Sequence, residues 1–245
     1  MTWELRTPFF FNDPQINLLI SLVFRFGMSI VVAYFAARSY VLTGSSNLFF
    51  LGTGVLAFGL SGMAGNTTSL IGGTTDTVIA INNIGALSAS VLYFIGSALT
   101  IRGKGPPQVR PASVQVTLIF GFLGIIGFTA LLTSLALQGA LPGFVAAQGS
   151  RTQLNNMVLF LTVALFALSS IVFMRFYSRS RSSIIYWYSL ALALLATSSA
   201  AFFLSKMPGD LISWAGRSAT CLGSTYLLIA VLAAIRVGES KTKRP

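Results

Sequence analysis

The chain has 245 residues, of which 54% are hydrophobic and only 9% are charged, and its mean hydropathy is +0.80. A soluble domain carries about 25% charged residues and a disordered chain has low hydrophobicity, so the composition excludes both classes. Sixteen basic residues against five acidic ones give a net charge of +11. This composition indicates a polytopic membrane protein.

Seven apolar runs follow one another along the chain, each long enough to cross about 30 Å of hydrocarbon as a helix. They cover residues 15–37, 46–64, 77–101, 113–138, 153–175, 183–204 and 211–236. The connections between them are short and contain turn-forming residues, which leaves no room for a second domain. The sequence therefore predicts one transmembrane domain over residues 1–245, an all-α integral membrane protein built as a bundle of seven transmembrane helices.

The basic residues predict how this bundle lies in the membrane. Eleven of them lie at the run ends that face one side: Arg38, Arg102, Lys104, Arg110, Arg175, Arg179, Arg181, Arg236, Lys241, Lys243 and Arg244. The other side holds Arg6, Arg151 and Lys206. Because positively charged loops stay cytoplasmic, we expect the N-terminus outside and the C-terminus in the cytoplasm, in a multi-pass protein of the plasma membrane. Spread over four loops, the charges argue against nucleic acid as a partner.

Polar residues inside the apolar runs are the candidate functional residues, because each is costly in a membrane unless it has a partner. Arg25 lies near the middle of the first run, and Arg217 lies about two turns into the seventh. Asp76 opens the third run on the same, outer side. The candidate pocket residues, all expected in the outer half of the bilayer or near its centre, are Arg25, Asp76, Asn82, Asn83, Asn155, Trp214 and Arg217.

Three interpretations of these residues stay open. Asp76 is the only acidic residue near the outer half of a run, so it is the natural ion-pair partner for an arginine such as Arg217. Alternatively, Arg217 snorkels to the outer interface. The third interpretation is a polar pocket, open outward, that binds an anionic or hydrogen-bonding ligand. Arg25 is too deep to snorkel readily, which favours an internal partner or a water-filled cavity for it.

Small and polar residues form stripes in three runs. Residues at three- and four-residue steps are Asn83, Ala86, Ser90, Tyr93 and Ser97 in the third run and Gly121, Gly124 and Gly127 in the fourth, and the second run is crowded with Gly52, Gly54, Gly59, Gly62 and Gly65. Small side chains let helix backbones approach closely. We therefore interpret these stripes as packing faces.

The residue types that catalysis and cofactor binding most often require are missing. The chain has no histidine, which excludes bis-histidine haem, histidine-ligated zinc or copper, and histidine acid–base chemistry. The single cysteine, Cys221, cannot form an internal disulfide or a thiolate metal site. The seventh run has no lysine that would bind retinal. We expect no enzymatic activity, no metal and no cofactor.

The seventh run contains a recognisable pattern. Its motif is Trp214-Ala215-Gly216-Arg217, followed by Leu222-Gly223 and Tyr226-Leu227-Leu228-Ile229-Ala230; Ile81, Asn83, Gly85, Ala86 and Gly96 in the third run and Tyr186-Trp187-Tyr188-Ser189 in the sixth fit the same pattern. This pattern resembles the multi-helix membrane sensor region that precedes PAS and histidine-kinase domains in archaea, especially methanogens. The resemblance implies a sensor whose output domain follows it or docks on it. The chain departs from the family at Asn82 and Tyr93, where histidines are common, and at Thr220 and Cys221.

These features together predict a membrane-embedded sensory domain without catalytic activity. It would sense a ligand or a membrane state in the outer-half polar pocket and relay the change through the seventh helix, with Trp214 and Arg217 at its outer end. The expected partners are the lipid bilayer and either a second copy of the chain or a cytoplasmic signalling protein. The alternatives are a small transporter or channel, or a structural subunit of a membrane complex. Transport requires polar residues that continue to the inner side, where the runs are nearly bare of charge, so sensing is favoured.

Overall fold

The computed structural model describes residues 13–44, 46–101, 111–146, 150–181, 183–205 and 209–242. This part of the chain is helical and contains no strand beyond one isolated bridge between Val145 and Arg151. The elements are α1 (Pro14–Ile20), the π-helix η1 (Ser21–Gly27), α2 (Met28–Thr43), α3 (Ser46–Leu70), α4 (Thr75–Ile101), α5 (Pro111–Leu137), α6 (Gln153–Ser180), α7 (Ser183–Leu204) and α8 (Leu211–Thr242). Because α1, η1 and α2 form one continuous rod, seven helices are long and apolar enough to cross a membrane. The predicted all-α class with seven spans is confirmed for the described residues.

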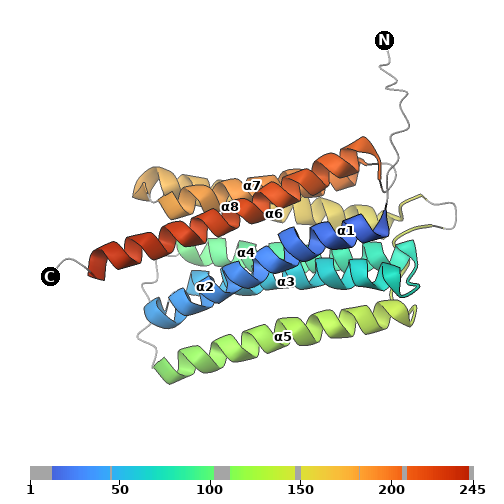
Figure 1. The fold of residues 1–245 in the computed structure, drawn as a ribbon. Helices are drawn as coiled ribbons and strands as arrows, with labels where there is room; N and C mark the ends of the chain where they lie inside the picture. The colour runs from blue at the N-terminus through green and yellow to red at the C-terminus, as the bar shows by residue number, and fades with distance from the viewer. Residues whose placement is uncertain are drawn as a thin grey trace, which may run out of the picture.

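Six of the seven spans form a closed ring of neighbours. Around the ring, α3 packs on α4, α4 on α6, α6 on α7, α7 on α8, and α8 on η1 and α2, which return to α3. The remaining span, α5, lies at the edge of the bundle against α2, α3 and α4 (Figure 1). Accordingly, α3 is the most buried of the spans and α5 the least. The ring is the frame that positions the candidate site.

Helix α3 is longer than the run over 46–64 predicts. It continues to Leu70 because three polar side chains bond to carbonyl oxygens of the preceding turn. Asn66 Nδ2 donates to Gly62 O at 2.7 Å, Thr68 Oγ1 to Gly65 O at 2.7 Å, and Ser69 Oγ to Asn66 O at 2.7 Å. These side chains are polar, but their hydrogen-bonding groups find partners within the helix. The helix can therefore continue past residue 64 and place Asn66 inside the bundle.

An aromatic core fills the bundle toward the end where α4 and α6 finish and α7 begins. Tyr93, Phe166 and Tyr188 are almost completely buried, and the ring centroid of Tyr93 lies 5.9 Å from that of Phe166 and 6.0 Å from that of Tyr188. Phe173 extends the cluster, 4.6 Å from Tyr188. The same core includes side chains of α8, so this helix is anchored in it.

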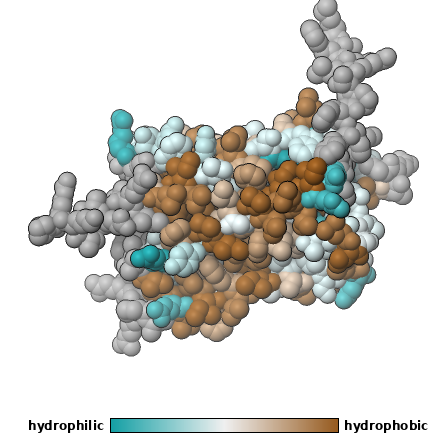
Figure 2. Space-filling view, in the orientation of Figure 1, coloured by the Kyte–Doolittle hydropathy of each residue, from teal (hydrophilic) through white to brown (hydrophobic). Residues whose placement is uncertain are grey.

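The outer surface has the character of a lipid-facing protein. Large apolar side chains such as Phe120, Leu131 and Phe160 are exposed. Figure 2 shows apolar residues gathered over the middle of this face, with the more hydrophilic ones mostly toward the two ends of the bundle. A contiguous apolar surface like this one would promote aggregation in water, whereas it is suited to contact with lipid hydrocarbon.

Candidate functional site

The ring of helices encloses a cavity of about 410 Å³. It lies at the end of the bundle where α4, α6 and α8 begin, which we call the cavity end. It reaches from Thr75 and Arg151, next to the connecting segments, down to Ala86 on α4 and Cys221 on α8. Five of the seven predicted site residues line it, namely Arg25, Asn82, Asn83, Asn155 and Arg217. The structure thus brings together residues from the first, third, fifth and seventh spans.

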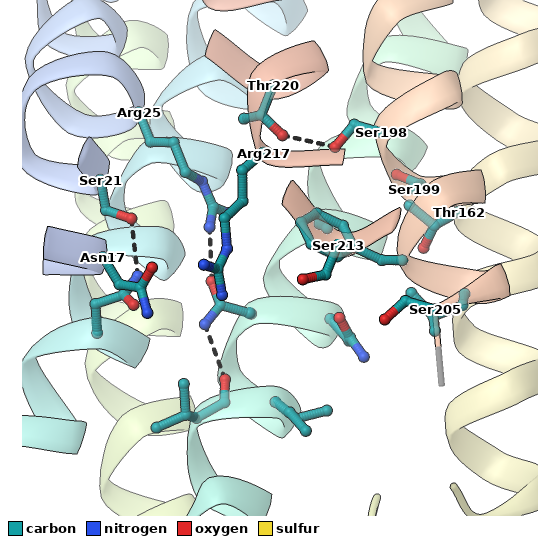
Figure 3. A pocket seen from close by; sticks show the side chains of 18 of the residues that line it. Asn17, Ser21, Arg25, Thr162, Ser198, Ser199, Ser205, Ser213, Arg217 and Thr220 are labelled. Atoms are coloured by element: carbon teal, nitrogen blue, oxygen red, sulfur yellow. Dashed lines mark hydrogen bonds between the residues drawn. The ribbon is translucent and has the colours of Figure 1, made fainter. Parts of the chain in front are cut away.

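Arg25 projects into the cavity from the π-helix η1 (Figure 3). Its Nη1 donates to Asn82 Oδ1 at 2.8 Å, and its Nη2 donates to the backbone oxygen of Phe58 at 3.4 Å. The guanidinium carbon also lies 4.4 Å from the centroid of the Phe58 ring, a cation–π contact. The Nε atom is buried and makes no hydrogen bond. Arg25 is therefore held in place by neutral groups.

Glycines on α3 make room for these polar side chains. A Cβ at Gly62 would lie 2.5 Å from Arg25 Cζ and 2.6 Å from its Nε, and a Cβ at Gly65 would overlap the amide of Asn82. A Cβ at Gly59 would lie 2.9 Å from the backbone oxygen of Arg25. The glycine pattern in the sequence predicts close helix packing, and the structure adds that these glycines leave the space that the side chains of Arg25 and Asn82 occupy.

Asp76 is not among the residues that line the cavity, and of the three interpretations that the sequence leaves open, the Asp76–arginine ion pair is not found in the described part of the chain. Asp76 Oδ1 accepts hydrogen bonds from the backbone N–H groups of Phe144 and Val145, both at 2.7 Å. These amides belong to the segment between α5 and α6, which folds against the start of α4. Unpaired N–H groups on a buried residue such as Phe144 attract the nearest carboxylate, and that carboxylate is Asp76.

Asn155 holds the same segment from the cavity side. Its Nδ2 donates to the backbone oxygen of Phe144 at 3.2 Å, and its Oδ1 accepts from Asn83 Nδ2 at 2.8 Å. Asn155 is only 1% exposed, so both partners are needed to satisfy its amide. The Asn155 side chain is therefore mainly a structural link, and Asn83 borders the open space.

Arg217 enters the cavity from α8 (Figure 3). Its guanidinium carbon lies 4.7 Å from the centroid of the Trp214 ring, one turn earlier. Trp214 is not among the lining residues, so it acts as a support for the arginine. Gly216 lets α8 approach α7, because a Cβ there would lie 3.2 Å from Ala201 Cβ. Asp210, at the start of α8, attracts Arg217 electrostatically.

A third arginine, Arg151, borders the cavity from the segment before α6. Its Nη1 donates to the backbone oxygen of Phe203 at 2.8 Å. Burial lowers the pKa of Arg151, and the nearby carboxylate of Asp210 partly opposes that shift. Sequence reasoning counted Arg151 only as a loop charge, because nothing in the sequence reveals that its loop folds over the helix ends.

Hydroxyl and amide groups complete the lining. The polar lining residues that the sequence did not identify as site candidates include Asn17, Ser21, Asn66, Thr162, Ser198, Ser199, Ser213 and Thr220. Some were detectable, since Asn17, Ser21 and Arg25 recur every four residues in an apolar run and so share one helix face. Ser198 and Thr220 bond to each other at 2.6 Å across α7 and α8 (Figure 3).

This lining is suited to binding a polar ligand. Within the described ranges no carboxylate borders the cavity, and no group of three potential metal ligands occurs. Arginines, amides and hydroxyls together recognise a ligand rich in hydrogen-bond acceptors. Comparison of the chain with protein-family models, curated proteins and solved structures finds no match, and nothing there links it to the archaeal sensor regions.

Proposed function

We propose that the chain is a ligand-sensing membrane domain without catalytic activity. A small polar ligand binds in the cavity, and α8 relays its arrival to the opposite end of the bundle. The observation that carries the proposal is the course of α8: it lines the cavity with Ser213, Arg217, Thr220 and Cys221, then joins the aromatic core, and runs on to Thr242. A two-state shift of such a helix is a common output of ligand binding.

The proposed orientation puts the cavity end outside the cell, in the plasma membrane. It is supported by the excess of basic residues in the segments at the opposite end. The end of α8 then lies in the cytoplasm, where a second copy of the chain or a signalling partner would receive the change.

The aromatic core favours sensing over conduction. Ala86 is a lining residue of the cavity, and Tyr93 lies seven residues further along α4, about 10 Å away at 1.5 Å per residue. Tyr93 is completely buried against Phe166 and Tyr188. The described lining therefore stops short of these packed rings, which favours a cavity that is closed toward the other end of the bundle.

Transport is a second candidate, favoured by one observation. The π-helix η1 interrupts the first span at Arg25, in the wall of the cavity. Irregular membrane helices with polar residues near mid-membrane line the binding sites of many secondary transporters. A transporter would expose the cavity to each side of the membrane in turn, whereas a sensor would keep it open to one side.

The single cysteine separates these candidates. Cys221 borders the cavity about 15 Å from the start of α8. We expect the small, anionic, membrane-impermeant reagent sulfonatoethyl methanethiosulfonate to modify Cys221 from outside intact cells and not from the cytoplasmic side of inside-out vesicles. Modification from both sides would indicate alternating access and support transport.

Two exposed positions calibrate the labelling in a Cys221→Ser background. Ile71→Cys, at the cavity end, should react only from outside, and Ser178→Cys, near the end of α6, only from the cytoplasmic side. The reverse pattern at these two positions would contradict the proposed orientation.

The relay itself is tested by filling the cavity. Ala86→Phe places a ring in the space that a ligand would occupy. Spin labels at Val41 and Leu232, both exposed on α2 and α8, report the separation of these helices by electron–electron double resonance in nanodiscs, again in Cys221→Ser. We expect Ala86→Phe to shift this distance by about 1–2 Å, the scale of helix movements in switching proteins.

Ala130→Phe is the matched control, because Ala130 is exposed on α5 and remote from the cavity. The control should leave the spin–spin distance unchanged. Equal distances in the parent, Ala86→Phe and Ala130→Phe proteins would contradict a relay through α8.

A further inference from the structure

The cavity contains buried positive charge that its own residues do not balance. Three arginines line it: Arg25 on η1, Arg151 in the segment before α6, and Arg217 on α8. No described lining residue is acidic. Of the described aspartates nearby, Asp76 is bonded to the amides of Phe144 and Val145. Asp210 attracts both Arg151 and Arg217. Among the described residues near the cavity, the carboxylate of Asp210 is therefore the one acidic group available to three guanidinium groups.

Among the described residues that line the cavity, Arg25 is the arginine that has no acidic partner. Its hydrogen-bond partners are the neutral oxygens of Asn82 and Phe58, which use two of its five N–H groups. Of the other three, the Nε–H makes no hydrogen bond and its nitrogen lies beside the space that a Cβ on Gly62 would fill, and each Nη keeps one further N–H. A charge held in the interior of a membrane protein without an opposite charge is costly. The protein nonetheless builds a seat for this arginine, with Gly59, Gly62 and Gly65 kept free of side chains.

We propose that Arg25 and Arg217 form the anion subsite of the cavity and that the ligand presents a carboxylate or phosphate group to them. This inference rests on the proposed ligand-binding role and names the chemical class of the ligand. Both arginines point into the cavity (Figure 3) from η1 and α8, elements that pack against each other. An oxyanion between them receives charge-assisted hydrogen bonds from planar guanidinium groups and supplies the counter-charge that Arg25 lacks.

The remaining wall selects the body of the ligand. Asn83 and the hydroxyl groups of Ser199 and Thr162 offer hydrogen bonds, and Leu159 and Phe202 offer apolar surface. The cavity of about 410 Å³ falls within the range of small-molecule sites. Small organic acids, phosphate and the headgroup of an acidic lipid share this chemistry, so the experiment is arranged to separate soluble from lipid sources.

The test measures the melting temperature of the purified chain in an uncharged detergent, at constant pH and ionic strength. Chloride in the buffer is exchanged for inorganic phosphate, acetate or succinate, with uncharged succinamide as the comparison. We expect at least one oxyanion, and not succinamide, to raise the melting temperature by about 5–10 °C at about 100 times its Kd. In a second arm, nanodiscs of phosphatidylcholine are compared with nanodiscs that also contain phosphatidylglycerol.

Arginine variants test whether a shift in melting temperature comes from binding at this subsite. Arg25→Gln should weaken oxyanion binding by about 10- to 100-fold. Arg25→Lys keeps the charge without the planar guanidinium group, so it should retain part of the affinity. Arg38→Gln, at an exposed position on α2, is the matched control and should bind like the parent. The melting temperature of each variant in chloride shows whether it is folded, and Arg25→Lys provides a folded variant if Arg25→Gln is not.

A shift with a soluble oxyanion that Arg25→Gln abolishes and Arg38→Gln preserves supports the proposal, with a soluble acid as ligand. An Arg25-dependent shift seen only with phosphatidylglycerol supports it with a lipid headgroup as the source. The absence of any Arg25-dependent shift in both arms overturns it. The relay experiment with Ala86→Phe uses no anion, so a response there combined with failure here would remove the anion subsite and leave the proposed sensing function intact.

Discussion

Replacing Gly59 by alanine is expected to destabilise the bundle by about 1–3 kcal/mol, the usual cost of adding a methyl group to a packed interior. A Cβ at this position would lie 2.5 Å from Ser29 Cβ and 2.9 Å from the backbone oxygen of Arg25. The second contact is with backbone and cannot be relieved by a rotamer change. Helix α3 must therefore move away from η1 and α2, which removes Arg25 from its seat.

Gly124→Ala is the matched control on α5. A Cβ there meets nothing within 4 Å, so only the helix propensity changes, and alanine is favoured over glycine by about 0.5–1 kcal/mol. The free energy of unfolding of both variants can be measured by titration with sodium dodecyl sulfate in mixed micelles. If Gly59→Ala were as stable as Gly124→Ala, the close approach of α3 to η1 would be contradicted.

This contrast shows where sequence reasoning succeeds and where it ends. Glycines at three-residue steps predict close packing in both α3 and α5, since the pattern is the same. In α3 the stripe faces η1 and α4 and admits Arg25 and Asn82, whereas Gly124 on α5 faces open space. Periodicity identifies a face of a helix, but the partner of that face depends on tertiary packing.

The spans themselves were readily predicted, because hydrocarbon thickness sets a simple length requirement for apolar runs. Polar residues in those runs were equally informative: Arg25, Asn82, Asn83, Asn155 and Arg217 do meet at one cavity. What was missed is local backbone irregularity. The π turns of η1 replace one set of backbone hydrogen bonds by another of similar strength, so no residue pattern reports them.

The sequence leaves the partner of Asp76 open for a related reason. Counting charges suggests an ion pair with Arg217, but carboxylates bind backbone N–H groups as readily as guanidinium groups. The segment between α5 and α6 offers two such N–H groups within 2.7 Å. Its path over the start of α4 is a property of the folded loop, which composition does not reveal.

Asp76→Ala is accordingly expected to cost about 2–4 kcal/mol of stability, because it leaves two backbone N–H groups without their charged acceptor. Asp76→Asn should cost less, since an amide oxygen still accepts hydrogen bonds. Asp13→Ala is the matched control: Asp13 Oδ1 also accepts from two backbone N–H groups, those of Gln15 and Ile16, but at an exposed helix start, where loss of a cap costs about 1 kcal/mol.

A double-mutant cycle decides between the two partners of Asp76. The free energies of unfolding of Asp76→Asn, Arg217→Lys and the double variant are measured in the same mixed micelles. Because Asp76 bonds to the loop amides and Arg217 stacks on Trp214, we expect the two single effects to add within about 0.5 kcal/mol. A coupling energy above about 1 kcal/mol would restore the ion pair and place Asp76 at the anion subsite, where it would compete with an acidic ligand for Arg217.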